Sequence, residues 1–386
     1  MKNFGYSLGL CVMFYLYAFS TGAQIRQEEA LDSAGLEIGY EAYMDFHYSS
    51  DFNHSRDNIR PYNSNPIAVN QFALAYTYAQ ASFNYRRMTA RAAFHTGEIV
   101  SLMYAGEDYL TKFIRELSFT YRLTYKMELE AGIFPAIYGA ETFINKDNLH
   151  ASRAVMTDFA PDFETGIRLK YKYSRYWRAT FQITNGWQAI KENNHSPGFG
   201  MVHIYDKPNK FLFNYGIFVG NEVYQSKNAL DQFKFYNNLF ARIHVGKRWI
   251  VAPMVDIGMM RNPVTQAMDQ WQAYGGSIRY ALTPEWGIAA RYERIYDPNQ
   301  IINEVITNTP NGFQLHGSTL TLEYNPAPQV MLRLEGRHSL SKDAIYNYWD
   351  GQKSKQDFFI MFSVAIQLKN STAVKMKQEP ALKDNY

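Results

Sequence analysis

Acidic and basic side chains alternate with apolar ones along many stretches of this sequence. In LEIGYEAYMDFHY, residues 36–48, the acids Glu37, Glu41 and Asp45 share one parity, and apolar side chains hold the other. Strict alternation over this length predicts a β-strand with two different faces. What chemistry the charges can perform depends on which solvent each face meets.

The residue types and their spacing give little support for a catalytic site. None of the histidines stands in a helical H-x-x-x-H pair or beside a nucleophile signature, and no glycine-rich loop precedes a helical pattern. We therefore predict no catalytic, cofactor-binding or metal-binding residues. A barrel hydrolase could still assemble a Ser/His or Asp/His site from separate strands, which linear spacing does not exclude. The scattered histidines include His47, His95, His150, His244, His316 and His338.

Composition excludes further classes. The chain has 386 residues, of which 16% are aromatic and 19% charged. No run of about 18 apolar residues, the length a membrane helix needs, follows the start of the chain, which excludes a bundle of such helices. The net charge of +3 is small for this length and gives no reason to propose a nucleic-acid partner.

The first residues have the anatomy of a secretory signal. Lys2 supplies the positive charge, residues 8–19 form the apolar core, and Ala23 is small enough for a cleavage site. We predict a signal peptide over residues 1–23 and a mature chain that starts at Gln24.

Two alternatives for this segment are disfavoured. A membrane anchor would need a longer apolar run, and a lipoprotein would need a smaller residue than Leu10 before Cys11. Cys11 is the only cysteine, so the mature chain has none. That excludes thiol catalysis, cysteine metal sites and a small disulfide-stapled domain.

Alternating stretches recur to the end of the chain, and their connections are short and long in turn. The short connections contain the Gly, Pro, Asn or Asp residues that tight hairpins require, and the long ones are polar. Because every second connection is tight, all tight turns must lie at one end. The predicted strands are residues 36–48, 71–83, 87–98, 114–124, 126–134, 163–174, 177–186, 199–206, 210–220, 233–246, 248–259, 271–282, 285–296, 313–325, 328–339 and 357–368.

This layout is typical of an all-β, transmembrane, antiparallel up-and-down β-barrel of about 16 strands, with short periplasmic turns and long extracellular loops. In lipid, every backbone polar group needs a partner within the protein, and a closed barrel supplies one because it has no free edge. The apolar faces would meet lipid and the charged faces would meet water inside. A soluble sandwich is the alternative, but it would bury its apolar faces against each other.

Aromatic residues cluster at the ends of the predicted tight turns, as expected where lipid headgroups begin. Ordinary enrichment of aromatics in strands would not predict this clustering. The residues are Trp177, Trp249 and Trp286 just after a turn, and Tyr173, Tyr280 and Tyr324 just before one.

The sequence predicts one domain. The barrel spans residues 36–368, after a periplasmic N-terminal segment over residues 24–35 and before a polar periplasmic tail over residues 369–386.

A sixteen-strand barrel encloses a lumen wide enough for water. The predicted lining contains equal numbers of basic and acidic residues, so ion preference depends on their arrangement along the pore. The basic residues are Arg91, Arg122, Arg168, Lys170, Lys172, Arg178, Arg242, Arg279, Arg291, Arg333 and Arg337. The acidic ones are Glu37, Glu41, Asp45, Glu116, Glu128, Glu130, Glu164, Asp256, Glu293, Glu323 and Glu335.

The longest predicted loop covers residues 135–162, and a loop of this length without strands of its own is usually functional. Folded into the lumen, it would narrow the channel. Alternatively, it caps the outer mouth or packs on a neighbouring subunit. The candidate constriction residues are Glu141, Asp147, Arg153, Asp158 and Asp162.

Several longer stretches carry a family resemblance. The most specific is AGIFPAIYGAETFINKDNLHASRAVMTDFAPDFETG, and the others are YMDFHYSSDFNHSRDNIRPY, ITNGWQ, VGNE and RYERIYDP. Over most of the mature chain, the sequence resembles the OmpL-like family of β-barrel porins from Gram-negative bacteria. The resemblance implies an outer-membrane barrel and a porin, but no substrate. It also suggests roles at the pore or its loop for Asn148, Ser152, Arg153, Asn185 and Trp187.

We therefore expect a porin, a passive channel for small hydrophilic solutes or ions, located in the outer membrane of a Gram-negative bacterium and lacking a cofactor. The expected partners are outer-membrane lipid, the solutes themselves, the barrel-assembly machinery and other subunits of a homotrimer. A barrel lipase or protease, or a surface adhesin or receptor with a plugged lumen, are the alternatives.

Overall fold

The computed structural model describes residues 35–53, 58–222, 232–348 and 350–374. The predicted signal peptide, nearly all of the predicted N-terminal segment and the tail from residue 375 lie outside the described residues.

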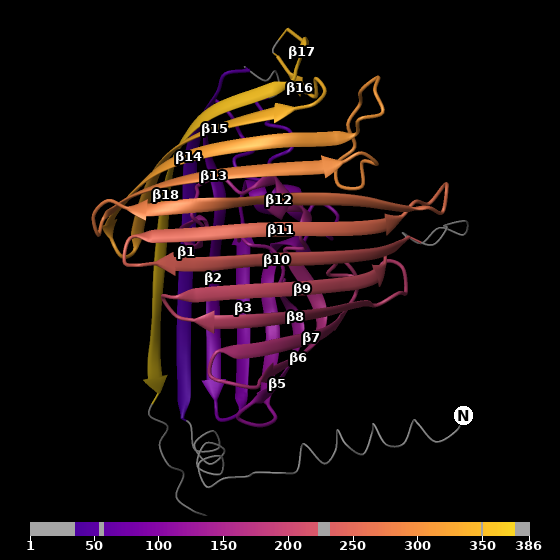
Figure 1. Ribbon diagram of the computed structural model, residues 1–386. Coiled ribbons are helices and arrows are strands. Elements are labelled where there is room, and N and C mark those ends of the chain that lie inside the picture. Colours follow the sequence, from indigo (N-terminus) through magenta and orange to yellow (C-terminus); the bar gives the residue numbers. More distant parts are fainter. Residues whose placement is uncertain (1–34, 54–57, 223–231, 349, 375–386) are drawn as a thin grey trace, which may run out of the picture.

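Sixteen strands of the described chain form one closed antiparallel barrel (Figure 1). Each strand pairs with its neighbours in sequence, and the last strand, β18, pairs with both β15 and β1. The strands are β1 Leu36–Asp51, β2 Phe72–Tyr85, β3 Met88–Thr96, β4 Ile114–Arg122, β5 Met127–Pro135, β6 Phe163–Lys172, β7 Trp177–Thr184, β8 Gly198–Lys207, β9 Phe211–Asn221, β10 Phe233–Val245, β11 Trp249–Arg261, β12 Met268–Ala281, β13 Trp286–Asp297, β14 Phe313–Ala327, β15 Val330–Ser341 and β18 Gln356–Val374.

The predicted strand number, order and up-and-down topology are confirmed. The C-terminal boundary differs, because β18 continues to Val374 where the sequence pattern predicts a tail from residue 369. Its last residues pair with the start of β1, Val374 opposite Leu36 and Asn370 opposite Tyr40. Backbone pairing does not require apolar side chains, so the strand continues beyond the last residue of the hydropathy alternation. The alternation therefore placed the end of the barrel too early.

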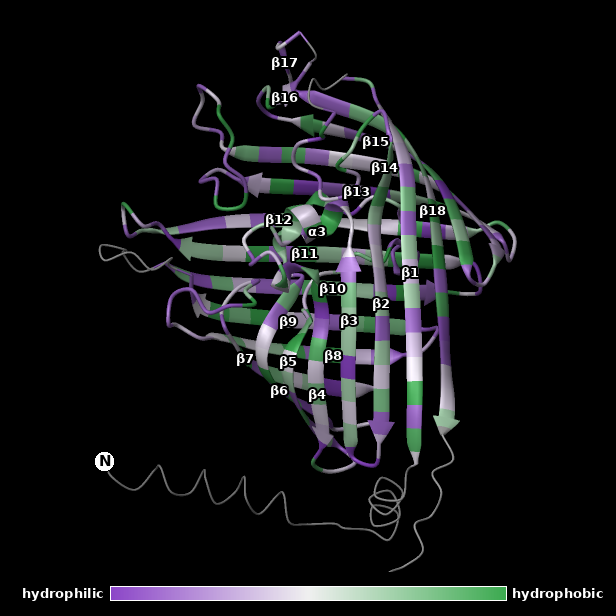
Figure 2. Ribbon diagram, turned by 180° about the vertical axis from the view of Figure 1, so that it is seen from behind, coloured by the Kyte–Doolittle hydropathy of each residue, from purple (hydrophilic) through white to green (hydrophobic). Residues whose placement is uncertain are grey.

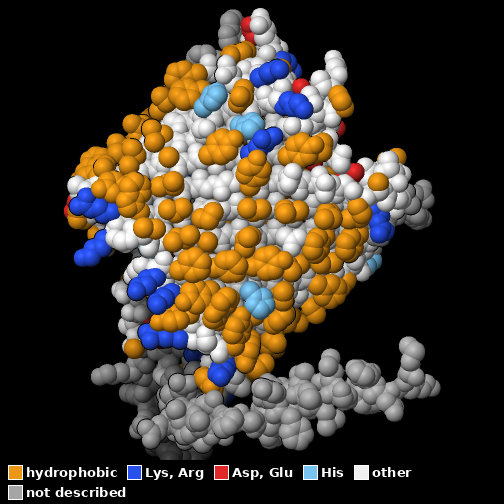
Figure 3. Space-filling model, viewed as in Figure 1, with side chains coloured by type: hydrophobic (Ala, Val, Ile, Leu, Met, Phe, Trp, Pro, Cys, Tyr) orange, Lys and Arg blue, Asp and Glu red, His pale blue; other side chains and the backbone are white. Residues whose placement is uncertain are grey.

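The two faces of each strand differ as the alternation predicts. In β1, Tyr40 is 53% and Phe46 43% exposed on the outside, whereas Tyr43 and Asp45 face inward and are buried. Figure 2 shows the same alternation of apolar and polar residues along the strands, and Figure 3 shows hydrophobic side chains spread across the outer wall. The outer rows form the band that lipid covers.

Aromatic pairs bridge neighbouring strands next to the tight turns. The ring centroids of Trp249 and Tyr280 lie 4.5 Å apart, and those of Trp286 and Tyr324 lie 4.4 Å apart. Both pairs are directly opposite in the strand register. The clustering predicted from sequence is therefore built from cross-strand contacts.

The long loops carry short elements of their own. They are the helix α3 Glu98–Met103, the 3-10 turns η1 Thr111–Phe113, η2 Asn145–Asp147 and η3 Val155–Phe159, and the two-residue strands β16 Tyr346–Asn347 and β17 Lys353–Ser354. No helix in the described part of the chain has the length and apolar character to cross a membrane.

Candidate functional site

The loop between β5 and β6, residues 136–162, lies inside the barrel. Its Tyr138 hydroxyl donates to the Ile217 carbonyl of β9 at 3.1 Å, and its Gly139 amide donates to the Asn238 side chain of β10 at 3.1 Å. Farther along, the loop reaches β13, β14 and β15 on the other side of the lumen. The loop thus crosses the lumen and is anchored to both sides.

Glu335 of β15 holds the middle of the loop. Its carboxylate accepts the amides of Ala151 at 2.7 Å and Ser152 at 3.0 Å, together with the Thr321 hydroxyl at 2.7 Å. It is fully buried. A buried carboxylate needs several donors to offset its desolvation, and the loop backbone supplies two of them.

Two arginines of β15 bind the carbonyl groups of the same loop. Arg333 donates to the carbonyls of Asn145 at 2.7 Å, Asn148 at 2.6 Å and His150 at 2.8 Å, and it pairs with Glu323 at 2.7 Å. Arg337 donates to the Arg153 carbonyl at 2.6 Å. The planar guanidinium offers five donors, so one side chain can fix several loop carbonyls.

Strand β13 completes this anchoring surface. Arg291 pairs with Glu141 of the loop at 3.0 Å and donates to the Ser152 carbonyl at 2.9 Å. Glu293 accepts the Met156 amide at 3.1 Å and pairs with Arg337. We call the inward faces of β13, β14 and β15 the anchoring wall.

His150 is a neutral anchor within this surface. Its two ring nitrogens lie 2.7 Å from the Thr321 hydroxyl and 3.1 Å from the Ser277 hydroxyl. Burial and the neighbouring Arg291 and Arg333 hold the pKa of His150 well below its ordinary value. Because the Thr321 hydroxyl also donates to Glu335, the neutral ring joins the loop to the hydrogen bonds of β14 and β15, and through Ser277 it reaches β12.

Arg153 forms an internal ion-pair cluster within the loop. It lies 3.3 Å from Asp158 and 3.0 Å from Asp162, and all three are buried or nearly so. Burial raises the pKa of Asp162 to about 7 against the opposing effect of Arg153, and it also raises the pKa of Asp158.

The described residues 58–71 of the first long loop interlock with the loop over residues 136–162, which we call the inner loop. The Ser64 amide and hydroxyl donate to Asp158 at 3.0 and 2.5 Å, and the Asn65 side chain donates to the Ala151 carbonyl at 3.3 Å. Arg60 ties this first loop to Asp357 of β18 at 3.4 Å. The two loops are therefore tied to each other and, through Arg60, to the barrel wall.

Two inward-facing glycines make room for the base of the inner loop. A Cβ atom at Gly200 of β8 would meet the Tyr138 hydroxyl at 2.1 Å, and one at Gly216 of β9 would meet the Tyr138 ring at 2.7 Å. Any side chain at these positions would displace Tyr138. These glycines in the inner row are the sequence signal that an inserted loop passes there.

The turn η2 presents the loop's most exposed charges. Asp147 is exposed and its carbonyl accepts from Arg242 of β10 at 3.1 Å, while Lys146 donates to the Pro328 carbonyl next to a tight turn. Partial desolvation inside the barrel and the nearby Glu41 raise the pKa of Asp147, with Arg242 acting in the opposite direction. The loop therefore extends from the outer mouth to the level of the periplasmic turns.

Two cavities flank this part of the loop. One of about 230 Å³ lies toward Arg115 of β4, and one of about 190 Å³ lies toward Arg242. Glu141 and Asp147 border both cavities. Acidic loop residues thus face a basic residue of the barrel wall on either side.

The predicted constriction residues are together in one loop, but their environments differ. Asp147 is exposed and Glu141 borders the cavities, whereas Arg153, Asp158 and Asp162 serve the internal cluster. Arg115 was missed by the sequence analysis. The pairing of β3 with β4 shifts at this point, with Ala93 opposite Glu116 and Phe94 opposite Ile114, so Arg115 is the extra residue of a bulge and leaves the alternation.

The predicted pore-lining residues also divide into two groups. Those that are buried are Arg168, Arg291, Arg333, Arg337, Asp45, Glu116, Asp256 and Glu335. Those that are partly exposed are Arg91, Arg122, Arg242, Arg279 and Glu41.

Partly exposed charges also lie on the inward faces of β3 to β6. We call the side chains of Arg91, Arg122, Glu128 and Lys170 the open wall. Arg91 lies 3.6 Å from Glu130, Lys170 lies 2.9 Å from the same carboxylate, and Arg122 lies 3.2 Å from Glu128. The two arginines keep 36% and 40% of their side-chain surface exposed. Water reaches this wall, unlike the anchoring wall.

No cluster of three or more His, Cys, Asp or Glu side chains suited to a metal ion occurs among the described residues.

Comparison with solved structures identifies outer-membrane proteins of the same fold. The anion-selective porin from Comamonas acidovorans has a TM-score of 0.55 at 9% identity, over 86% of this chain and 98% of that one. The outer-membrane channel DcaP of Acinetobacter baumannii has a TM-score of 0.58 at 11% identity, over 87% and 98%. OmpT of Vibrio cholerae, in its trimer form, has a TM-score of 0.56 at 9% identity, over 87% and 100%.

At these identities the likeness shows a shared fold alone. No curated protein sequence matches the chain. A family profile does match, over residues 37–368, which is almost the whole barrel, and that family is described as "Putative beta-barrel porin-2, OmpL-like". The chain therefore belongs to the OmpL-like β-barrel porin family, whose members are outer-membrane porins.

Proposed function

We propose that this porin is a passive diffusion channel for small hydrophilic solutes and ions, with the loop over residues 135–162 as its constriction. One observation carries the proposal: the loop crosses the lumen and presents Glu141 and Asp147 toward cavities bordered by Arg115 and Arg242. Opposed charges across a narrow hydrated path orient and screen solutes as they pass. No chemical step and no cofactor is needed for such transport.

Planar-bilayer recording of the purified protein tests this function. We expect a stable open conductance with a weak ion preference, because acidic and basic groups face each other across the path. A membrane that stays electrically silent would overturn the channel function and favour a surface receptor with a plugged barrel.

Export follows the route predicted from the sequence. Residues 1–23 act as the signal peptide, and the barrel-assembly machinery inserts the chain into the outer membrane. N-terminal sequencing of protein purified from outer membranes should begin at Gln24. A sequence that begins at Met1 would contradict cleavage.

A homotrimer is the assembly we propose. The support is that OmpT of Vibrio cholerae, which shares the fold, was solved in a trimer form. Light scattering coupled to size exclusion, corrected for detergent, should give three times the mass of the mature chain. A mass of one chain would contradict the trimer.

A further inference from the structure

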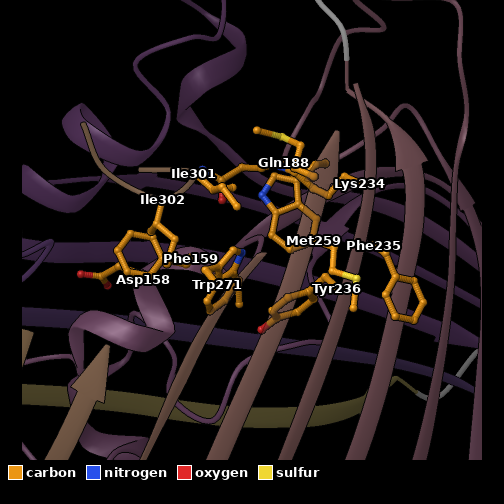
Figure 4. Close-up of a pocket in the computed structure, with 13 residues that line it drawn as sticks. Asp158, Phe159, Gln188, Lys234, Phe235, Tyr236, Met259, Trp271, Ile301 and Ile302 are labelled. Atoms are coloured by element: carbon orange, nitrogen blue, oxygen red, sulfur yellow. The ribbon is translucent and has the colours of Figure 1, made fainter. Parts of the chain in front are cut away.

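A cavity with aromatic walls lies where the inner loop meets the outer ends of β10, β11 and β12. Its volume is about 240 Å³. It is lined by the inner loop, by the loop after β7, by the loop after β13, by the first residues of β10 and β12 and by the last residues of β11 (Figure 4). The side chains that matter below are Phe159, Trp187, Lys234, Tyr236 and Trp271.

The aromatic walls support one another. The rings of Tyr236 and Trp271 stack at 5.9 Å with 26° between their planes, and Trp187 stands edge-on to Tyr236 at 4.9 Å and 84°. Phe159 of the inner loop closes the set edge-on to Trp271 at 6.2 Å. Rings fixed in this way are preorganised, which reduces the entropy lost when a ligand binds.

Gly258 of β11 fixes the position of the Trp271 indole. The two residues are directly opposite in the register, and a Cβ at Gly258 would meet the indole nitrogen at 2.1 Å. The indole therefore lies flat across the neighbouring strand.

Lys234 places one positive charge in this lining. Its ammonium lies 4.5 Å from the centre of the Trp187 ring. Among the described residues no carboxylate forms an ion pair with it, although Glu222 attracts it from a greater distance. The Glu222 carboxylate instead accepts the Trp187 amide at 3.0 Å. A partly buried cation that no carboxylate contacts directly favours binding of an anion.

Two of the other polar side chains at the cavity, Gln188 and Asp158, are already engaged. The Gln188 amide accepts from the Asp162 backbone at 3.0 Å and donates to the Met103 carbonyl at 3.2 Å. Both Asp158 oxygens accept from Ser64. The hydroxyl groups of a sugar would thus find few free partners, whereas a ring with a single anionic group would satisfy both the rings and the lysine.

We propose that this cavity is a binding subsite of the outer vestibule for small aromatic carboxylates, in which the ring packs among Trp187, Tyr236 and Trp271 and the carboxylate pairs with Lys234. The proposal rests on the channel function above and names a solute class for it. The size agrees, because a cavity of about 150 Å³ suffices for benzene, and the remaining volume accommodates the carboxylate.

Tryptophan fluorescence of the purified full-length mature protein in detergent tests the subsite. Titration with benzoate should give a saturable change, since two tryptophans line the cavity. Acetate has the charge without the ring, benzamide has the ring without the charge, and glucose is a neutral sugar. Each should bind at least about tenfold more weakly than benzoate. Equal binding of benzamide or glucose would overturn the proposal.

Lys234→Met keeps the length of the side chain and removes its charge. Benzoate affinity should fall by about tenfold or more, because a charge-assisted hydrogen bond is lost. Lys172→Met, at an exposed lumen position far from the cavity, should leave affinity unchanged. A β-sheet circular dichroism spectrum confirms that both variants are folded. Unchanged affinity in folded Lys234→Met would overturn the subsite.

Bilayer conductance separates this proposal from the channel function. Conductance in potassium chloride without saturable benzoate binding overturns the subsite alone. Saturable benzoate binding by a protein that does not conduct supports the subsite and overturns only the channel.

Discussion

Arg333 and Arg91 occupy equivalent places in the barrel but have different environments. Each is the fourth residue after a tight turn, one in β15 and one in β3, and each faces inward. Arg333 keeps 1% of its side-chain surface exposed and binds three loop carbonyls, whereas Arg91 keeps 36% exposed beside Glu116 and Glu130. The same residue type thus anchors a loop on one wall and lines water on the other. The difference arises because the inner loop packs against Arg333, whereas water reaches Arg91.

The largest expected effect is on stability. Arg333→Met should reduce the free energy of unfolding by about 3–5 kcal/mol, because it leaves one oxygen of Glu323 and the carbonyls of Asn148 and His150 without their donor. Arg91→Met should cost no more than about 1 kcal/mol, as expected for an exposed ion pair. Urea titration of both variants in the same detergent measures the difference. Equal losses would mean that the two walls do not differ.

The next effect concerns how the loop fits against its glycines. Gly216→Ala brings a methyl group to 2.7 Å from the Tyr138 ring, and overpacking of this kind costs about 1–3 kcal/mol. Gly336→Ala is the matched control, because no atom lies within 4 Å of its added Cβ. The unfolding midpoint should fall only for Gly216→Ala, and a similar midpoint in both would indicate that Tyr138 is loosely held.

A pH effect should arise from the cluster around Arg153. Burial raises the pKa of Asp162 from 3.8 to about 7, so between these values the folded protein binds a proton that the unfolded chain has released. Stability should therefore fall as pH rises from about 4 to about 7. Asp162→Asn, which cannot ionise, should flatten this part of the profile of unfolding midpoint against pH. An unchanged slope would assign the pH dependence to other groups.

The smallest effect should be on ion preference. Asp147→Lys at the exposed turn η2 should shift the reversal potential toward anions. An exposed charge contributes about 0.2–1 kcal/mol, which corresponds to a change in permeability ratio of about 1.5–5-fold. Lys170→Met on the open wall should shift it in the opposite direction. Bilayer recording in a salt gradient measures both, and no shift for Asp147→Lys would argue that ions bypass the loop.

The strands were predictable from sequence because alternation and turn residues are local signals. The alternation of charged and apolar residues from Glu37 onward indicates a strand, and residues 246–248 indicate a tight turn, each without information from the rest of the chain. The division between Arg333 and Arg91 was not predictable in this way, since both read as inward charges. It depends on a loop nearly 200 positions away in sequence from the arginine it contacts, as in the bond from Arg333 to Asn145.

Two further features of the site show the limits of a periodic pattern. Arg115 lies in a bulge, so a strict period of two groups it with the outward-facing residues of β4 and does not reveal it as a residue of the lumen. Lys234 was not singled out, because a single lysine in a strand carries no signal until Trp187 and Trp271 are seen beside it. The inner-row glycines Gly200 and Gly216 were visible but were not read as a space left for another segment.

The pairing of β1 with β18 has a consequence for how the chain is built. The first and last strands share the longest register in the barrel, from Leu36 opposite Val374 to Asp51 opposite Phe359. Until β18 has been synthesised and paired, β1 has an unpaired edge. Arg333 and Glu335 then cannot yet bind the inner loop, and Asp357 cannot yet pair with Arg60. Completion of the interior therefore waits for the final hairpin. A nascent or truncated polypeptide should fold slowly, should aggregate through its unpaired edge and should depend on a chaperone that covers that edge.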